Sequence, residues 1–273
     1  MEAVKYKYQE LEFQVFFNDH AANDFNTLFT NMPSDREYYA AGVPGSFYNR
    51  LFPDSFLHIV NSFYSINWLS EVPKQVLDKS SSAWNKGRIH YSSAPDDVVK
   101  AFEAQNRDDM DRFLSARAKE VVQGGLMVLV APGRPNGTPH SLCPSNLALD
   151  ALGSCFLELV KKGVIEEEKM DSFNIPMYYM SPQELTESVE RNGYFSIEQI
   201  EAIPNIGENF TFPKEQICLT IRAIVGVHVK EHFGEEILDQ LFELYLKKLE
   251  EPSVNYNHQI KKVVNVFAFL KRK

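Results

Sequence analysis

Cysteine is scarce in this sequence, and the spacing of the cysteines argues against a disulfide-stabilised protein. The chain has 273 residues but only three cysteines, Cys143, Cys155 and Cys218, with no CxxC spacing. An odd number of cysteines without that spacing does not indicate a disulfide framework. We therefore expect reduced thiols, as in a cytoplasmic protein.

Long runs of one charge or of apolar residues are missing as well. The 37 Asp and Glu outnumber the 28 Lys and Arg, which gives a net charge of −9 without any basic cluster. Nucleic acid is therefore not an expected partner. The apolar run Leu126–Ala131 is far shorter than the roughly 20 residues of a membrane helix. The first residues form no apolar signal segment, so we expect no membrane partner.

Several catalytic signatures are also missing. The sequence contains no P-loop, no GxSxG elbow and no kinase motif set, and its glycine pairs are too short for a dinucleotide fingerprint. One pattern, HxxEH from His228 to His232, would place two imidazoles on one helix face, as in zinc peptidases. An ordinary amphipathic helix is the preferred interpretation, because a third zinc ligand would have to come from elsewhere.

Alternating strands and helices are what the sequence does contain. Apolar runs predict strands at 12–18, 56–62, 125–133, 193–202 and 262–270. Amphipathic periodicity predicts helices at 23–30, 96–122, 146–162 and 231–250, and a capping box at Ser181–Glu184 opens one more. This alternation predicts an α/β fold with a mostly parallel sheet.

Ligands of such sheets bind at the carboxyl ends of the strands, where two side chains are notable. Asp19 follows the first strand, and a carboxylate there can accept both hydroxyls of a nucleotide ribose; a turn residue or helix cap is the alternative. Trp68 follows the second predicted strand, and its indole N–H can only donate. It fits a pocket with apolar walls and a few donors, or else a core aromatic cluster.

A third candidate site is built from oxygen ligands only. Asp171–Asn174 forms a DxxN pattern, and Asn85 lies far upstream. Such ligands are preferred by a hard cation such as Mg²⁺. A simple turn is the usual interpretation of this pattern.

Several of these segments together resemble the plant SABATH family, named for salicylic acid, benzoic acid and theobromine methyltransferases. The resemblance extends from about Glu12 to the C terminus and is carried by Phe16–Asn26, Gly42–Tyr48, Ser65–Ser70, Asn85–Gly87, Glu166–Tyr178 and His232–Glu235. It implies a Rossmann-like class I methyltransferase core with a helical cap. It also implies transfer of a methyl group from S-adenosylmethionine to the carboxylate of a small-molecule acid, or to a ring nitrogen as in the caffeine branch, by a homodimer.

The resemblance also implies roles for individual residues. Asp19 would bind the cofactor ribose, with the adenine beside His20, Ser46 and Phe47. Trp68 would donate to the substrate carboxylate in a pocket shared with Tyr64, Asn67, Tyr178 and Ile221. A Mg²⁺ site would consist of Asn85, Asp171, the carbonyl of Phe173 and Asn174. No residue is expected to act as acid or base, because a carboxylate with an unperturbed pKa of about 4 is already ionised.

The sequence departs from this family at the substrate pocket and at its start. His20, Asn67, Ala148 and Leu149 replace the family's usual residues, which favours a larger or more polar acid than salicylate. Family members also carry, before the position of Met1, a first central strand and a glycine-rich cofactor loop. We therefore expect a single methyltransferase domain over 1–273 without its first core strand, with cap insertions at about 74–110, 140–180 and 205–250. The alternative is an inactive shortened homologue that acts, if at all, as dimer partner of a full-length enzyme.

Overall fold

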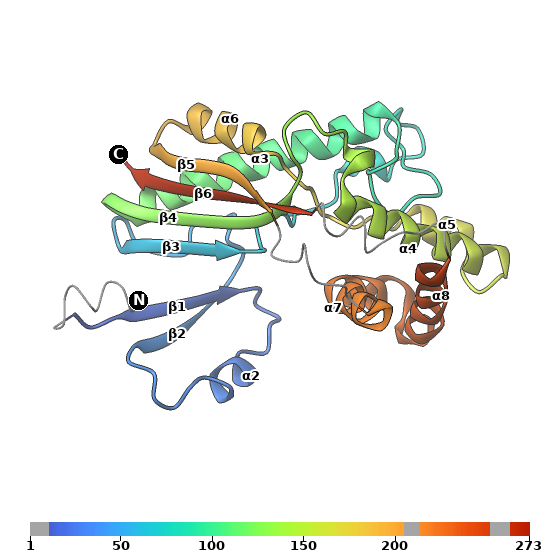
Figure 1. Cartoon of the computed structure of the whole chain (residues 1–273), viewed down its shortest axis with the longest axis horizontal. Coiled ribbons are helices and arrows are strands. Elements are labelled where there is room, and N and C mark those ends of the chain that lie inside the picture. The colour runs from blue at the N-terminus through green and yellow to red at the C-terminus, as the bar shows by residue number, and fades with distance from the viewer. Residues whose placement is uncertain (1–10, 205–212, 252–262) are drawn as a thin grey trace.

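The computed structural model describes residues 11–204, 213–251 and 263–273, and it is an α/β structure (Figure 1). Its strands are β1 (Gln14–Asp19), β2 (Tyr39–Pro44), β3 (Leu57–Phe63), β4 (Val121–Gly133), β5 (Phe195–Pro204) and β6 (Val264–Arg272). Its helices are α2 (Phe25–Thr30), α3 (Asp96–Glu120), α4 (Pro144–Lys161), α5 (Glu167–Asp171), α6 (Pro182–Asn192), α7 (Lys214–Phe233) and α8 (Leu238–Glu250). Short 3-10 turns lie at Lys74–Val76, His140–Leu142 and Glu235–Ile237.

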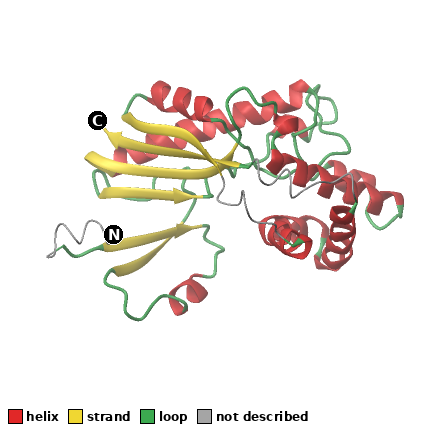
Figure 2. Cartoon of the chain, viewed as in Figure 1, coloured by secondary structure: helices red, strands yellow, loops and turns green. Residues whose placement is uncertain are grey.

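The strands form two separate sheets (Figure 2). β1 pairs in parallel with β2, while the larger sheet has the order β3-β4-β6-β5. Within the larger sheet only β3 and β4 are parallel, and β6 runs antiparallel to both of its neighbours. The expected mostly parallel sheet is therefore wrong for the C-terminal half of the chain. Among the described residues no ladder joins β1 to β3.

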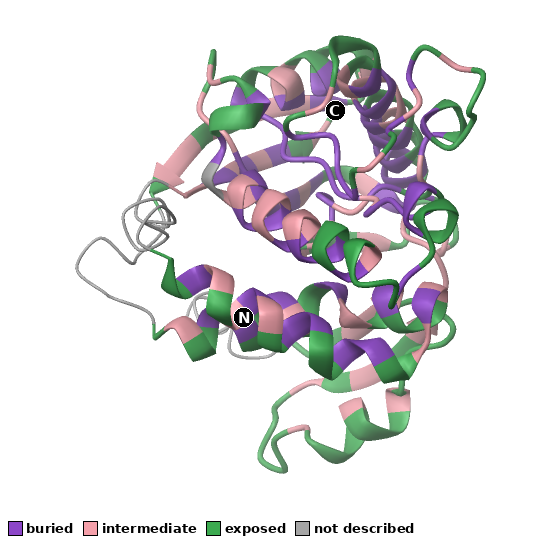
Figure 3. Ribbon diagram, turned by 90° about the vertical axis from the view of Figure 1, so that its right-hand side faces the viewer, coloured by how far each residue is buried: buried purple, intermediate pink, exposed green. Residues whose placement is uncertain are grey.

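Two apolar cores position the site. One core lies between the larger sheet and α3 and α6, and the other joins α4, α7 and α8 to the segment 170–179. In Figure 3 the helices carry buried residues along one side and exposed residues along the other. β1 and β3 point toward the α7 and α8 side of the molecule (Figure 1). The carboxyl ends of these two strands therefore face a layer of helices.

Local sequence explains several of the element boundaries. The predicted capping box is confirmed, because the Ser181 hydroxyl accepts from the Glu184 amide and the Glu184 carboxylate accepts from the Ser181 amide. The predicted single helix 231–250 is wrong. Gly234, with φ of +100°, ends α7, and α8 begins after a 3-10 turn. Leu241 and Tyr245, which the sequence predicts on the apolar face of this helix, are buried in α8 as expected.

β2 and α7 were not predicted. β2 contains Gly42, where a Cβ would lie 2.9 Å from the ring of Phe25, so glycine allows α2 to approach this strand. In α7 the buried residues recur every four positions from Ile217, but the exposed Leu219 and Val227 blur the pattern. The last predicted strand matches β6, although Lys262 lies outside the described residues.

Two expectations from what the sequence lacks can be compared with the structure. All three cysteines are free and buried, which confirms reduced thiols. Among the helices that the structure describes, none has both the length and the apolar character needed to span a bilayer.

One buried histidine makes the stability of this fold depend on pH. His90 is fully enclosed, its Nε2 lies 3.1 Å from the Met177 carbonyl, and burial lowers its pKa to about 3. The unfolded chain binds a proton at this residue below about pH 6.5, whereas the folded chain does not until about pH 3. The free energy of unfolding should therefore fall as pH decreases through this window, by about 1.4 kcal/mol per pH unit at most from this group.

Urea unfolding at pH 7, 6 and 5 measures this effect. The His90→Phe variant should show a shallower dependence on pH, while the same substitution at the exposed His58 should leave it unchanged. Equal slopes in all three proteins would contradict the assignment to His90.

Candidate functional site

The first part of the site is the carboxyl end of the small sheet, where hydrogen bonds connect β1 to the turn after β2. The side-chain Nδ2 of Asn18 donates to the backbone carbonyls of Val43 (2.7 Å) and Gly45 (2.9 Å). The Gly45 amide donates to the Asp19 carbonyl at 2.9 Å. These bonds hold the turn after β2 against the end of β1. Ser46 and Asp19, which lie far apart in sequence, are thereby brought to one edge.

Asp19 presents an exposed carboxylate at that edge. Its Oδ1 accepts from the His20 amide at 2.7 Å, and within the described part of the chain no side chain donates to it. Asp24 caps α2 instead, by accepting from the Thr27 amide at 3.1 Å. The alternative of Asp19 as a helix cap is therefore wrong, and its carboxylate is available to a ligand.

Phe47 and its neighbours form an aromatic wall next to Asp19. The Phe47 ring lies 4.4 Å from the Tyr48 ring and 6.0 Å, edge on, from Phe113 of α3. Phe47 and Ser46 are both partly exposed. An apolar ring beside a hydroxyl and a carboxylate matches the needs of a nucleoside, which has an apolar base and a polar ribose.

The end of β3 carries the second part of the site. Tyr64 adopts a left-handed conformation with φ of +55°, which costs a residue with a Cβ about 1–2 kcal/mol. Its amide donates to the Val130 carbonyl at 2.7 Å, which holds this conformation, and its side chain is 51% exposed. Strain of this kind is typical of functional sites.

Trp68 is held from several directions. Its backbone forms a bridge with Met177, its carbonyl accepts from the Tyr48 hydroxyl, and its amide donates to the Ser65 carbonyl at 3.0 Å. Its indole ring packs against the core of α4, α7 and α8. None of the described residues accepts a hydrogen bond from the indole N–H. A rigidly held donor without a protein partner is what recognition of a ligand carboxylate requires.

His228 of α7 packs against the indole ring of Trp68. Its ring centroid lies 5.1 Å from that of Trp68, with 35° between the ring planes. Burial lowers the pKa of His228, the charge of Glu231 opposes this shift, and His20 lowers the pKa further. His20, which follows β1, is close enough to His228 to influence its pKa, so the end of β1 is on the side that faces α7. His228 is therefore a neutral ring at neutral pH.

Three of the expected pocket residues are buried. Tyr178 is fully enclosed, Asn67 is 3% exposed and Ile221 is 8% exposed. The Tyr178 backbone amide donates to the Asn67 carbonyl at 2.8 Å. This bond lies next to the Trp68–Met177 bridge, so both residues help to fix the backbone of Trp68. Ile221 belongs to the same apolar core against which Trp68 packs.

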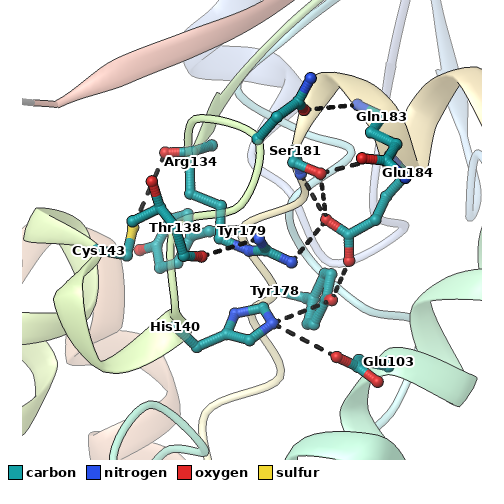
Figure 4. A network of polar contacts seen from close by, with 12 residues as sticks. Glu103, Arg134, Thr138, His140, Cys143, Tyr178, Tyr179, Ser181, Gln183 and Glu184 are labelled. Carbon is teal, nitrogen blue, oxygen red and sulfur yellow. Dashed lines mark hydrogen bonds and ion pairs between the residues drawn. The ribbon is translucent and has the colours of Figure 1, made fainter.

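The Tyr178 hydroxyl belongs to a polar network that sequence reasoning missed (Figure 4). It donates to the Glu184 carboxylate, which also accepts from Arg134 at 2.8 Å. His140 lies 3.6 Å from a carboxylate oxygen of Glu103 and 3.4 Å from the Tyr178 hydroxyl. Burial and the charge of Glu184 raise the pKa of Tyr178, so its hydroxyl stays a neutral donor. Because both Glu184 oxygens already accept hydrogen bonds, this network is better suited to holding α6 than to binding a metal ion.

The expected cation residues do come together. The Asn85 amide nitrogen donates to Asn174 Oδ1 at 2.6 Å, and Asp171 Oδ1 accepts from the Gly87 amide at 2.8 Å. Asn85, Asp171, Phe173 and Asn174 are all buried. Asn85 Oδ1 is buried without a hydrogen-bond partner. An orphaned amide oxygen near a buried carboxylate fits a hard cation.

The HxxEH histidines contact different partners. His232 Nε2 lies 2.9 Å from the Lys169 carbonyl, whereas His228 packs on Trp68. Both line a cavity of about 280 Å³ together with Phe173 and Asn174. In the described ranges the side chains that could share a metal ion are those of the Glu103–His140–Glu184 cluster, which does not include these histidines. The two histidines of this pattern therefore do not share a metal site, and they lie in the last two turns of α7, not at the start of a helix as expected.

Comparison with known proteins agrees with this geometry. A family model described as SAM dependent carboxyl methyltransferase matches residues 1–273. The chain belongs to this family. The methyltransferase is 46% identical to loganic acid O-methyltransferase from Catharanthus roseus, over 100% of this chain and 75% of that protein. It is 38% identical to farnesoic acid carboxyl-O-methyltransferase from Arabidopsis thaliana, over 92% of this chain and 74% of that protein.

A solved structure shows the same fold. The methyltransferase superposes on loganic acid methyltransferase with SAH with a TM-score of 0.96 and 46% identity, covering 100% of this chain and 78% of that one. The Rossmann-like class I methyltransferase fold is therefore confirmed. So are S-adenosylmethionine as cofactor and carboxyl O-methylation as the activity. These comparisons do not favour the alternative of an inactive partner chain.

Proposed function

We propose that this methyltransferase converts a small-molecule carboxylic acid into its methyl ester at the carboxyl ends of β1 and β3, on the side that faces α7. The observation that carries this proposal is the unpartnered indole N–H of Trp68, held rigidly between the β3 loop, Met177 and His228. An N–H donor binds a carboxylate without protonating it. S-adenosylmethionine, when bound, supplies a methyl group on a positively charged sulfur.

The protein contributes orientation, not acid–base chemistry. Because the carboxylate is already ionised, one of its oxygens can attack the methyl carbon as the carbon–sulfur bond breaks, and no proton moves. Asp19, His20, Ser46 and Phe47 form the edge that would hold the nucleoside. Trp68 would orient the acid beside the exposed Tyr64, with Asn67, Tyr178 and Ile221 supporting the pocket from its buried side. Orientation of this kind is sensitive to small displacements.

The acid is proposed to be larger or more polar than salicylate. Asn67 has a buried amide oxygen without a partner, and Ala148 and Leu149 offer less bulk than the family's usual pair. A transfer assay with labelled S-adenosylmethionine and a panel of benzoates and larger hydroxylated acids tests this. We expect methyl esters, with the larger acids preferred. Methylation of a ring nitrogen, or of benzoate alone, would contradict the proposal.

We further propose a Mg²⁺ ion at Asn85, Asp171, the Phe173 carbonyl and Asn174. The support is the orphaned Asn85 oxygen and the burial of all four residues. The ion would hold the segment that leads to Met177, whose backbone bridges Trp68. Its role would then be structural and would not include the chemical step.

Magnesium should therefore raise thermal stability. At a hundredfold excess over its Kd, an ion that binds only the folded state adds about 2.7 kcal/mol, and Tm should rise by several degrees. Asp171→Asn should abolish this rise, while the same substitution at the exposed Asp78 should preserve it. A Tm that does not respond to Mg²⁺ in the unsubstituted protein would exclude the site.

The remaining expectations are proposals of the same kind. We propose a single methyltransferase domain over 1–273 with the cap insertions given above, a homodimer, and a cytoplasmic location. The three free cysteines support the location. Light scattering of the purified protein tests the dimer.

A further inference from the structure

A buried ion pair lies at the end of α3. Arg117 is 4% exposed and Glu120 is fully enclosed, and Arg117 Nε lies 2.7 Å from Glu120 Oε2. Burying two charges is costly, and an apolar pair of similar volume is often at least as stable. The contacts of this pair with the rest of the chain therefore matter more than the pair itself.

Arg117 binds the loop that follows β2. Its two terminal nitrogens donate to the carbonyls of Phe47 and Asn49, each at 3.0 Å. Its guanidinium also lies 5.4 Å from the centre of the Phe113 ring, whose edge contacts the Phe47 ring. The rigid fork of an arginine is suited to holding two carbonyls at once.

Glu120 binds the next part of the same loop. Its Oε1 accepts from the amides of Leu51 and Phe52, the second at 3.0 Å. Four peptide groups between Phe47 and Phe52 are therefore fixed by two side chains of one helix. This loop belongs to no strand or helix, so the ion pair replaces the backbone ladder that it lacks.

We propose that Arg117 and Glu120 are positioning residues that hold the Ser46–Phe47 loop ready for the nucleoside of S-adenosylmethionine. This inference rests on the proposed placement of the cofactor at Asp19, Ser46 and Phe47. Fixing the backbone of a flexible loop costs conformational entropy, and a loop that is ordered beforehand does not incur this cost on binding. Neither charged side chain needs to touch the cofactor.

The test separates cofactor affinity from the rest of catalysis. In Arg117→Lys and Glu120→Gln, the Kd and KM for S-adenosylmethionine should rise about tenfold or more. Lysine cannot hold both carbonyls in a fixed fork, and glutamine loses the charge that pairs with Arg117 and strengthens the hydrogen bonds from the Leu51 and Phe52 amides. The KM for the acid, and kcat at saturating cofactor, should stay within about twofold. Unchanged cofactor affinity, or a loss of kcat alone, would overturn the proposal.

Two controls make the result specific. Leu185→Ala removes a fully buried side chain from α6, which lies above the larger sheet in Figure 1, whereas β2 lies below it. If this variant, at a matched loss of Tm, weakens cofactor binding equally, the effect is general destabilisation and the proposal is wrong. Asp19→Asn reports on the cofactor site itself. If it alone leaves the Kd unchanged, the proposed site is wrong; if it weakens binding while the Arg117 and Glu120 variants do not, only the present inference fails.

A measurement on the unsubstituted protein covers the case of variants that do not fold. Hydrogen exchange should find the Leu51 and Phe52 amides protected before S-adenosylhomocysteine is added, because Glu120 already accepts from both. Protection that develops only after the ligand binds would show that the loop is not held in advance.

Discussion

Replacing Trp68 by phenylalanine should lower kcat/KM for the acid by about 10- to 100-fold. The substitution keeps an aromatic ring against His228 but removes the indole N–H, and a hydrogen bond to a charged group contributes about 1.5–3 kcal/mol. The loss should be largest in the KM for the acid, while the Kd for S-adenosylmethionine should change little. Steady-state kinetics with the acid varied at saturating cofactor measure this.

The chain provides a matched control for that experiment. Trp84 is the second of only two tryptophans, and it lies in the loop before α3, where the Lys86 ammonium lies over its ring. Trp84→Phe should retain the KM of the unsubstituted protein. If both variants lose activity equally, or neither does, Trp68 is not the residue that recognises the carboxylate.

Replacing Asp19 by asparagine should weaken S-adenosylmethionine binding by a similar 10- to 100-fold. The variant keeps the size of the side chain and its acceptor for the His20 amide, but it loses the charge that would bind the ribose hydroxyls. The KM for the acid should change little, because Trp68 lies on a different strand end.

Asp35→Asn makes the same change of charge at an exposed site between α2 and β2 and should leave the Kd unaltered. If Asp19→Asn binds the cofactor with an unchanged Kd, the nucleoside does not bind at the end of β1. The Trp68 and Asp19 variants thus divide the proposed site into an acid part and a cofactor part.

The strand ends could be predicted because the strands themselves are apolar and local. β1, β3 and β4 follow from short runs of apolar residues, and Asp19 and Trp68 follow directly from where those runs end. β2 could not be predicted, because Gly42 and Pro44 interrupt its pattern and α2 packs on it only in three dimensions. The antiparallel placement of β6 depends on a pairing with β4 that no local pattern encodes.

The parts of the site that the sequence did not predict are those formed by residues far apart in sequence. His228 was visible only as part of a zinc-like pattern, and its contact with Trp68 depends on how α7 docks. Arg117 and Glu120 look like ordinary charges on an amphipathic helix until the loop 47–52 is seen against them. The burial of Tyr178 likewise depends on Glu184 and Arg134, which approach it from α6 and the end of β4.

The central claim is that one site binds the cofactor at Asp19 and the acid at Trp68. Calorimetric titration of S-adenosylhomocysteine into the protein, followed by titration of an accepted acid into that complex, tests it most directly. The account predicts two saturable binding events, with the first weakened by Asp19→Asn alone and the second by Trp68→Phe alone. If neither ligand produces heat, or if each variant weakens both events equally, the account is contradicted.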